Sequence, residues 1–596
     1  MLGSRVVMHH TFLARRTPAH PRALMLAAAL CACGGPSLPA RPASPPKCPA
    51  TAPEPDAPAT VATPSVPTLR YRIRPEPGPE PKVVVELVVS APSSVDLRGF
   101  TIPRAARTLG DVRVLDASGV VPAQSTAAGG DAVLIALSRA PVGALTIRYA
   151  VRASGDVQAS ASTLVVGDDR FRGPGERFVL MPVALADVPC EVTLDIDTGP
   201  LHVPEAASSF GVGITRTRKA LGRAAVMSAY VAGALGRATF EGSLERDEAA
   251  WLGYTAFDPR PAAAEIAGVR SALQELWRGD EQQYTVLFAS SARPEGSYSV
   301  VPRASSMMVH LGPDETWSAP LRLGIAQTLA RSWVGGAELR FGAQEQDWLY
   351  DGLARYVGAY LLSNMGLLLP DDTQRLLHGL LSVQATSPLR GKSLAEIRKL
   401  SAADPKARAH MTAVASLHAF RVAALFSQGG ASSLPKVLRA FTQRVRESHQ
   451  RLPAEAWSLM LEKELGPAEA RKLEEVLAGK DVELPSATLG PCFAPTPASF
   501  AAFDLGFDPQ ATADSERLEI VGLDPAGPAA WAGLAVTDVL LASSYKDGDP
   551  STLVALTVQR AGQKKELRYK PLGPTRRGVS FARRPGKRDA ECGTLP

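Results

Sequence analysis

The sequence predicts a multidomain α+β protein, and three of its features lead to that prediction. Its 596 residues are enough for about four domains of ordinary size. Apolar residues make up 45% of the chain and charged residues 21%, which is typical of globular rather than disordered protein. Near Pro261 the spacing of apolar residues changes from the alternation of strands to the period of helices. We therefore expect a β-rich part first and a mainly helical part after it.

Residues 1–33 have the features of an export signal. Four arginines precede an apolar run at 23–33 that is too short to span a membrane as a helix. The segment Leu30-Cys31-Ala32-Cys33 resembles the lipobox of bacterial lipoproteins, so we expect Cys33 to be the lipidated N-terminus. Because no Asp follows Cys33, we expect an outer-membrane lipoprotein, on its periplasmic or surface face. The alternative is a plain signal peptide without lipid.

The next segment, residues 34–67, is rich in Pro, Ala and Ser. Such a composition cannot bury a core, and it predicts an extended tether between the membrane anchor and the folded body. Removal of the signal segment with its four arginines would lower the formal net charge from +6 to +2. A nearly neutral chain gives no reason to expect a nucleic-acid partner.

Strand patterns fill residues 68–255. Runs such as 68–74, 82–89 and 144–151 alternate apolar and polar residues, and turn-forming residues separate them. A β-sandwich is the simplest fold for such a series of strands.

Two stretches in the middle of the chain predict a pair of helices. In the first, 325–335, an apolar stripe that includes Leu329 and Trp333 repeats every four residues. The second, 348–357, follows Asp347, a residue type that caps helices. We expect further helices at 264–277, 371–381, 405–426, 433–449 and 454–477.

These two stretches together resemble the core of gluzincin metallopeptidases. The resemblance lies in the pattern Leu-Ala-x-x-Trp-x-Gly, then a loop, then Trp-Leu-x-acid-Gly-x-Ala-x-Tyr. The gluzincin group includes thermolysin-like aminopeptidases and PDZ-bearing glycyl aminopeptidases. The resemblance implies a thermolysin-like, mainly helical domain over 256–485. In the family the first helix carries H-E-x-x-H and the second supplies a Glu ligand to zinc. In this register the four positions hold Gln327, Thr328, Arg331 and Asp351.

Those residue types cannot perform the family's chemistry. Arg331 carries a permanent positive charge where an imidazole would bind the cation, and Thr328 has no carboxylate to act as a base. The resemblance therefore implies a pseudopeptidase without zinc or another cofactor. We expect Arg331 to form an ion pair with Asp351 across the two helices. The alternative is that both side chains face solvent.

The last domain, 490–575, contains three motifs that resemble a PDZ domain. Asp504-Leu505-Gly506-Phe507 resembles the carboxylate-binding loop, 522–540 the short helix and following strand, and 558–562 a late hairpin. The resemblance implies that Leu505, Gly506 and Phe507 hold the C-terminus of a peptide or protein. The alternative is a domain that packs on its neighbour and binds nothing.

Cysteines flank this domain at Cys492 and Cys592. An exported protein permits disulfides, and the ends of a compact domain are often close, so we expect the two to be joined. We expect residues 576–596 to form a basic tail that this disulfide holds against the domain. The alternative is that the tail is disordered and Cys592 is free.

Two functions remain open on the sequence. The first is a catalytically inactive surface lipoprotein that binds peptides or partner proteins through its PDZ domain and degenerate cleft. Its lipid anchor would attach it to the membrane. The second is an active peptidase or other hydrolase that uses a non-standard site. The chain has no G-x-S-x-G elbow and no Walker loop, which favours the first.

Overall fold

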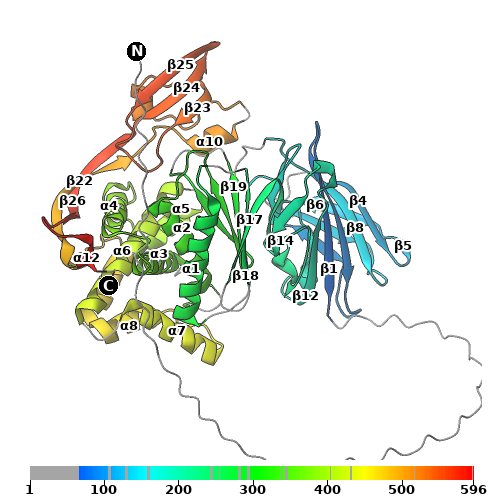
Figure 1. The fold of residues 1–596 in the computed structure, drawn as a ribbon, viewed down its shortest axis with the longest axis horizontal. Coiled ribbons are helices and arrows are strands. Elements are labelled where there is room, and N and C mark those ends of the chain that lie inside the picture. Colours follow the sequence, from blue (N-terminus) through cyan, green and yellow to red (C-terminus); the bar gives the residue numbers. More distant parts are fainter. Residues whose placement is uncertain are drawn as a thin grey trace, which may run out of the picture. The chain divides into compact units, whose positions relative to one another are not determined.

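The structure is a computed structural model that describes residues 66–104, 109–127, 132–156, 162–241, 246–253, 256–278, 283–291, 296–336, 339–342, 347–402, 404–429, 433–515, 517–593 and 595 (Figure 1). These residues belong to one unit of the chain, Ala62–Pro596. The expected signal segment, the lipidation site Cys33 and the tether up to residue 65 lie outside the described residues.

Three sheets form the N-terminal part. A seven-stranded sheet has the order β15-β12-β1-β2-β8-β4-β5, beside sheets of order β14-β13-β16-β10-β9 and β11-β3-β7-β6. In β1 the apolar residues Leu69, Tyr71 and Ile73 are buried and the residues between them are exposed, as period-two alternation dictates. The strands are β1 (Thr68–Glu76), β2 (Lys82–Ser90), β3 (Gly99–Ile102), β4 (Leu109–Asp116), β5 (Gly119–Val120), β6 (Ala123–Ala127), β7 (Val133–Leu137), β8 (Leu145–Arg152), β9 (Val165–Val166), β10 (Phe171–Pro174), β11 (Met181–Pro182), β12 (Pro189–Ile196), β13 (Glu205–Ser208), β14 (Gly211–Val212), β15 (Thr215–Leu221) and β16 (Ala229–Gly233).

The boundary of this part lies earlier than the expected residue 255. Strands β17 (Leu235–Glu241) and β18 (Arg246–Leu252) join β19 (Thr285–Ser290), β21 (Ser306–Leu311) and β20 (Ser299–Arg303) in a sheet of order β17-β18-β19-β21-β20. β18 pairs in parallel with β19, with Ala249 opposite Val286. Local alternation identifies a strand but not the sheet it joins, so the sequence placed β17 and β18 with the wrong neighbours.

The first helix of this part lies between β18 and β19, and the other helices follow the sheet. The helices are α1 (Pro259–Trp277), α2 (Ala319–Trp333), α3 (Asp347–Asn364), α4 (Pro370–Thr386), α5 (Leu394–Ser401), α6 (Pro405–Gly429), α7 (Leu434–Ser448), α8 (Ala456–Leu465) and α9 (Pro467–Leu477). The single helix expected over 454–477 is divided at Gly466, whose φ of 93° ends α8 and precedes Pro467, and α5 was not expected. Within the described residues, α6 is the one helix long and apolar enough to cross a membrane, and 78% of its most apolar window is buried inside the protein.

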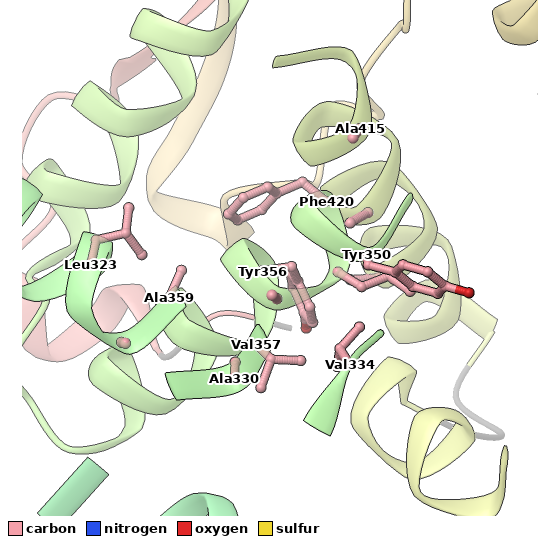
Figure 2. Packing of buried hydrophobic residues seen from close by; sticks show 14 of the residues in the cluster. Leu323, Ala330, Val334, Tyr350, Tyr356, Val357, Ala359, Ala415 and Phe420 are labelled. Atoms are coloured by element: carbon pink, nitrogen blue, oxygen red, sulfur yellow. The ribbon is translucent and has the colours of Figure 1, made fainter. Parts of the chain in front are cut away.

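Helix α3 is buried between α2 and α6. Figure 2 shows Tyr356 beside Phe420 of α6, and their rings meet edge to face with centroids 5.4 Å apart. A Cβ atom at Gly352 would lie 2.1 Å from the carbonyl oxygen of Ala415 in α6. The glycine of the Trp-Leu-x-acid-Gly pattern is therefore required by the close approach of two helix backbones.

The C-terminal part contains a small sheet and a long ribbon. Its elements are β22 (Phe493–Phe503), α10 (Pro509–Asp514), α11 (Pro528–Trp531), β23 (Val539–Ser544), β24 (Val554–Arg560), β25 (Gln563–Tyr569), β26 (Leu572–Arg583) and α12 (Asp589–Cys592). The sheet has the order β23-β24-β25, and β22 pairs with β26 in an antiparallel ribbon. The expected helix and strand of 522–540 correspond to α11 and β23, and the expected hairpin to β24 and β25.

The basic segment after residue 575 is folded and is not a tail. β26 packs on α4, where Gln374 Nε2 donates to the carbonyl oxygen of Phe581 at 2.8 Å and Arg583 pairs with Asp371 at 2.9 Å. Cys492 and Cys592 form a disulfide with a Cα separation of 5.0 Å. The sequence suggested a tail because the basic residues of β26 hide its strand alternation, whereas the ribbon is stabilised by its partner strand and by α4.

Candidate functional site at the α2–α3 helix pair

Helices α2 and α3 run antiparallel and approach closely. A Cβ atom at Gly358 of α3 would lie 3.0 Å from the backbone nitrogen of Gln327 in α2. Two side-chain contacts cross this interface one helical turn apart. We call Gln327, Arg331, Asp351 and Arg355 the cross-helix ladder, because residues four apart share a face of each helix.

The first contact of the ladder joins Arg331 and Asp351. Arg331 Nε donates to Asp351 Oδ1 at 2.8 Å, and its Nη1 donates to the carbonyl oxygen of Val334 at 2.8 Å. The guanidinium also lies over the ring of Tyr350, 5.2 Å from the centroid. The side chains are 29% and 36% exposed, so the pair is half-buried. The expected pairing is present, and the alternative of two solvent-facing side chains is wrong.

The second contact joins Arg355 and Gln327. Arg355 Nε donates to Gln327 Oε1 at 2.9 Å. Burial lowers the pKa of Arg355, while Tyr298 and Asp351 nearby favour its charged form. The sequence analysis did not single out Arg355, although its position four residues after Asp351 placed it on the same face of the expected helix.

The remaining polar groups around the ladder have local partners. Thr328 Oγ1 donates to the carbonyl oxygen of Gly324, one turn back in α2, at 2.8 Å. Tyr298 donates to the carbonyl oxygen of Pro320 at 2.6 Å, and burial raises the pKa of Tyr298 to about 12. Neither of these two groups is arranged to accept a proton from water.

The ladder does not fit a zinc ion. Zinc sites in proteins use thiolate, imidazole and carboxylate ligands, and among Gln327, Thr328, Arg331 and Asp351 only the last is of this kind. Its carboxylate is already bound to a cation. Across the described ranges no group of three or more His, Cys, Asp and Glu is placed to hold a metal.

Histidines of α6 are core residues. His418 is buried, and its Nε2 accepts a hydrogen bond from Trp457 Nε1 at 3.1 Å. Burial and the nearby Arg421 lower the pKa of His418 to about 4. His410 is also buried, and burial lowers its pKa. Both are neutral core side chains at neutral pH.

A serine–histidine contact lies at the junction of α4 and the ribbon. His378 Nδ1 is 2.9 Å from Ser580 Oγ, and the ring packs against Phe500. Ser580 is only 5% exposed, so its hydroxyl is covered by the ribbon and α4. This geometry fixes the ribbon to the helix and does not present a nucleophile to a substrate.

The loop at 504–507, which the sequence assigned to peptide binding, is partly built into the core of the C-terminal part. Leu505 and Phe507 are buried, and the Leu505 carbonyl oxygen accepts a hydrogen bond from the Tyr569 hydroxyl at 2.8 Å. The Gly506 N–H donates to Asp504 Oδ1 at 2.9 Å. Residues 509–514 directly after the loop form helix α10 rather than a strand. The segment that directly follows this loop therefore offers no strand edge to a peptide.

The fold formed by the N-terminal sheets, the sheet β17-β18-β19-β21-β20 and the helices around α2 and α3 is similar to that of solved aminopeptidase-like structures. An aminopeptidase N family protein from Idiomarina loihiensis has a TM-score of 0.61 and 15% identity, over 86% of this chain and 98% of that one. An M1 zinc metallopeptidase from Deinococcus radiodurans has a TM-score of 0.42 and 16% identity, over 71% and 95%. Yeast leukotriene A4 hydrolase in complex with bestatin has a TM-score of 0.43 and 12% identity, over 72% and 71%. No protein-family profile and no curated protein sequence matches the chain.

Proposed function

We propose that this chain is a catalytically inactive, exported peptidase-like protein that binds peptides or partner proteins and does not cleave them. The observation that carries the proposal is the Arg331–Asp351 ion pair, with an Nε–Oδ1 distance of 2.8 Å, at positions that the gluzincin resemblance assigns to zinc ligands. A permanent cation satisfies the one remaining carboxylate, so a divalent metal at this position would meet electrostatic repulsion from Arg331.

Binding does not require the catalytic groups of the family. The ladder side chains are half-buried, so a ligand can reach them. The PDZ-like domain is a second proposed binding module, in which Leu505, Gly506 and Phe507 are the residues assigned to a peptide C-terminus. Because Leu505 and Phe507 are buried, the ladder is the better supported of the two.

The proposal also includes the location of the protein. Lipid on Cys33 would attach the chain to the bacterial outer membrane, with residues 34–67 as a tether. The partners are then peptides or protein C-termini in that compartment and the membrane itself, and not nucleic acid. Replacement Cys33→Ser should release the protein from the membrane fraction, and unchanged fractionation would contradict lipidation.

An activity assay tests the loss of catalysis. The exported chain, residues 34–596, is incubated with fluorogenic aminoacyl and peptide substrates with and without added zinc, beside the matched variant Asp351→Ala. We expect no zinc-dependent hydrolysis above that of the variant, whose residual rate measures contaminating peptidases. Turnover in the wild-type chain that disappears in Asp351→Ala would refute the proposal.

A further inference from the structure

Arg355 is a desolvated cation without a full set of partners. Its Nε donates to the neutral oxygen of Gln327, and its Nη1 and Nη2 have no hydrogen-bond partner among the residues that the structure describes. The side chain is partly exposed, so solvent reaches part of it. Arginine offers five N–H donors, of which four therefore remain open to a ligand.

Arg331 adds one further donor group to the same face. Its Nε is bound to Asp351 and its Nη1 to the Val334 carbonyl oxygen, while its Nη2 has no partner in the described part of the chain. The ladder places Arg331 and Arg355 diagonally across the antiparallel helices, one turn apart. Two guanidinium groups and one carboxylate give the ladder a formal charge of +1.

We propose that Arg355, assisted by Arg331, binds a carboxylate group of the bound peptide. This inference rests on the proposed peptide-binding function and names the chemical group that the site selects. A carboxylate matches the planar fork of a guanidinium and would provide the charged partner that Gln327 cannot supply. Buried charges in proteins are usually paired in this way.

The charge of the ladder decides between ligand classes. A free amine would be repelled by the net positive charge, because Asp351 is already bound to Arg331. A single negative charge neutralises the formal +1, whereas a phosphate dianion would leave an excess negative charge in a half-buried site. A carboxylate at a peptide C-terminus and one on an Asp or Glu side chain share the required chemistry.

Binding measurements on the exported chain, residues 34–596, test this inference. The probes are acetyl-Ala-Ala-Ala-Leu with a free C-terminus, the same peptide as its amide, and acetyl-Ala-Glu-Ala-Leu as an amide. Saturation-transfer NMR and calorimetry measure the affinities for wild type, Arg355→Gln, Arg355→Lys and the control Arg340→Gln. Arg340 is exposed and lies outside the ladder, so its variant removes the same charge without removing the site.

We expect the free acid to bind at least about tenfold more tightly than the amide, the difference that a charge-assisted hydrogen bond provides. Arg355→Gln should abolish that difference, Arg355→Lys should reduce it, and Arg340→Gln should retain it. A preference shared by the Glu peptide identifies any peptide carboxylate as the ligand, and a preference for the free acid alone identifies a C-terminus.

Four results would overturn the inference. Equal binding of acid and amide would remove the carboxylate site but leave peptide binding intact, whereas binding of neither peptide would contradict both proposals. An acid preference that persists in folded Arg355→Gln or Arg355→Lys protein, at wild-type strength, would place the site elsewhere. Inorganic phosphate and acetate are also compared as competitors of the free-acid peptide. If phosphate displaces the peptide at least about tenfold better than acetate does, the site selects phosphate and not a carboxylate.

Discussion

Removal of either partner of the Arg331–Asp351 pair should destabilise the helical domain, and the two losses should not add. An exposed ion pair contributes at most about 1 kcal/mol, and breaking a buried pair costs about 3–5 kcal/mol. The side chains are 29% and 36% exposed and share one hydrogen bond rather than two. We therefore expect a coupling free energy of about 1.5 kcal/mol, between the two limits.

The single variants should differ in a defined order. Arg331→Met should lower the free energy of unfolding more than Asp351→Asn does. Arg331→Met also removes the hydrogen bond to Val334 and the contact with the Tyr350 ring, and these losses add about 0.5–1 kcal/mol to the destabilisation.

A double-mutant cycle in urea measures this coupling. Tryptophan fluorescence reports the helical domain, because Trp277, Trp333, Trp348 and Trp457 all lie in its core. Arg152 and Glu80, 67% and 78% exposed, form a control pair whose coupling should be close to zero. A coupling for Arg331 and Asp351 no larger than that of the control would refute the role of this ion pair.

Three further predictions follow from the packing. Gly352→Ala should destabilise the protein by about 1–3 kcal/mol, because the added methyl group would overlap the backbone of α6. The control Gly379→Ala has open space around the added methyl group and should be neutral or stabilising in the same urea titration. The free energy of unfolding should fall as the pH drops from about 6.5 to about 4, because His418 binds a proton in the unfolded chain at a higher pH than in the folded one. The expected loss over this range is about 3 kcal/mol. A pH series on the variant His418→Gln should show a smaller loss over the same range. Replacing Cys492 and Cys592 by Ala should cost up to about 4.7 kcal/mol, since the disulfide spans 100 residues, and a non-reduced digest that yields Cys592 unlinked would contradict the bond itself.

Much of the fold could be predicted because its signals are local. The period of Leu321, Ile325, Leu329 and Trp333 fixed α2, and all four side chains are buried. The pairing of Arg331 with Asp351 followed from their positions on two helices that a known pattern places together. What remained hidden depends on distant neighbours, as when β17 and β18 join the sheet of β19, or when β26 is held by β22 and α4.

The candidate site was predicted in part for the same reason. The family's motif identifies the positions that hold zinc ligands in relatives, and position 355 is not one of them. Its importance comes from the Gln327 oxygen that it meets across the helix interface and from its burial. Spacing of four residues from Asp351 was the signal that could have revealed it.

Equilibrium zinc binding to the exported chain tests the central claim most directly. We expect no stoichiometric zinc after dialysis against micromolar metal, because Arg331 holds Asp351 and no group of three or more metal-ligating side chains is found among the residues that the structure describes. The variant Asp351→Ala is the control and should behave as wild type does. One zinc per chain in the wild type that is lost in Asp351→Ala would show that the ladder binds metal, and the account of an inactive centre would be wrong.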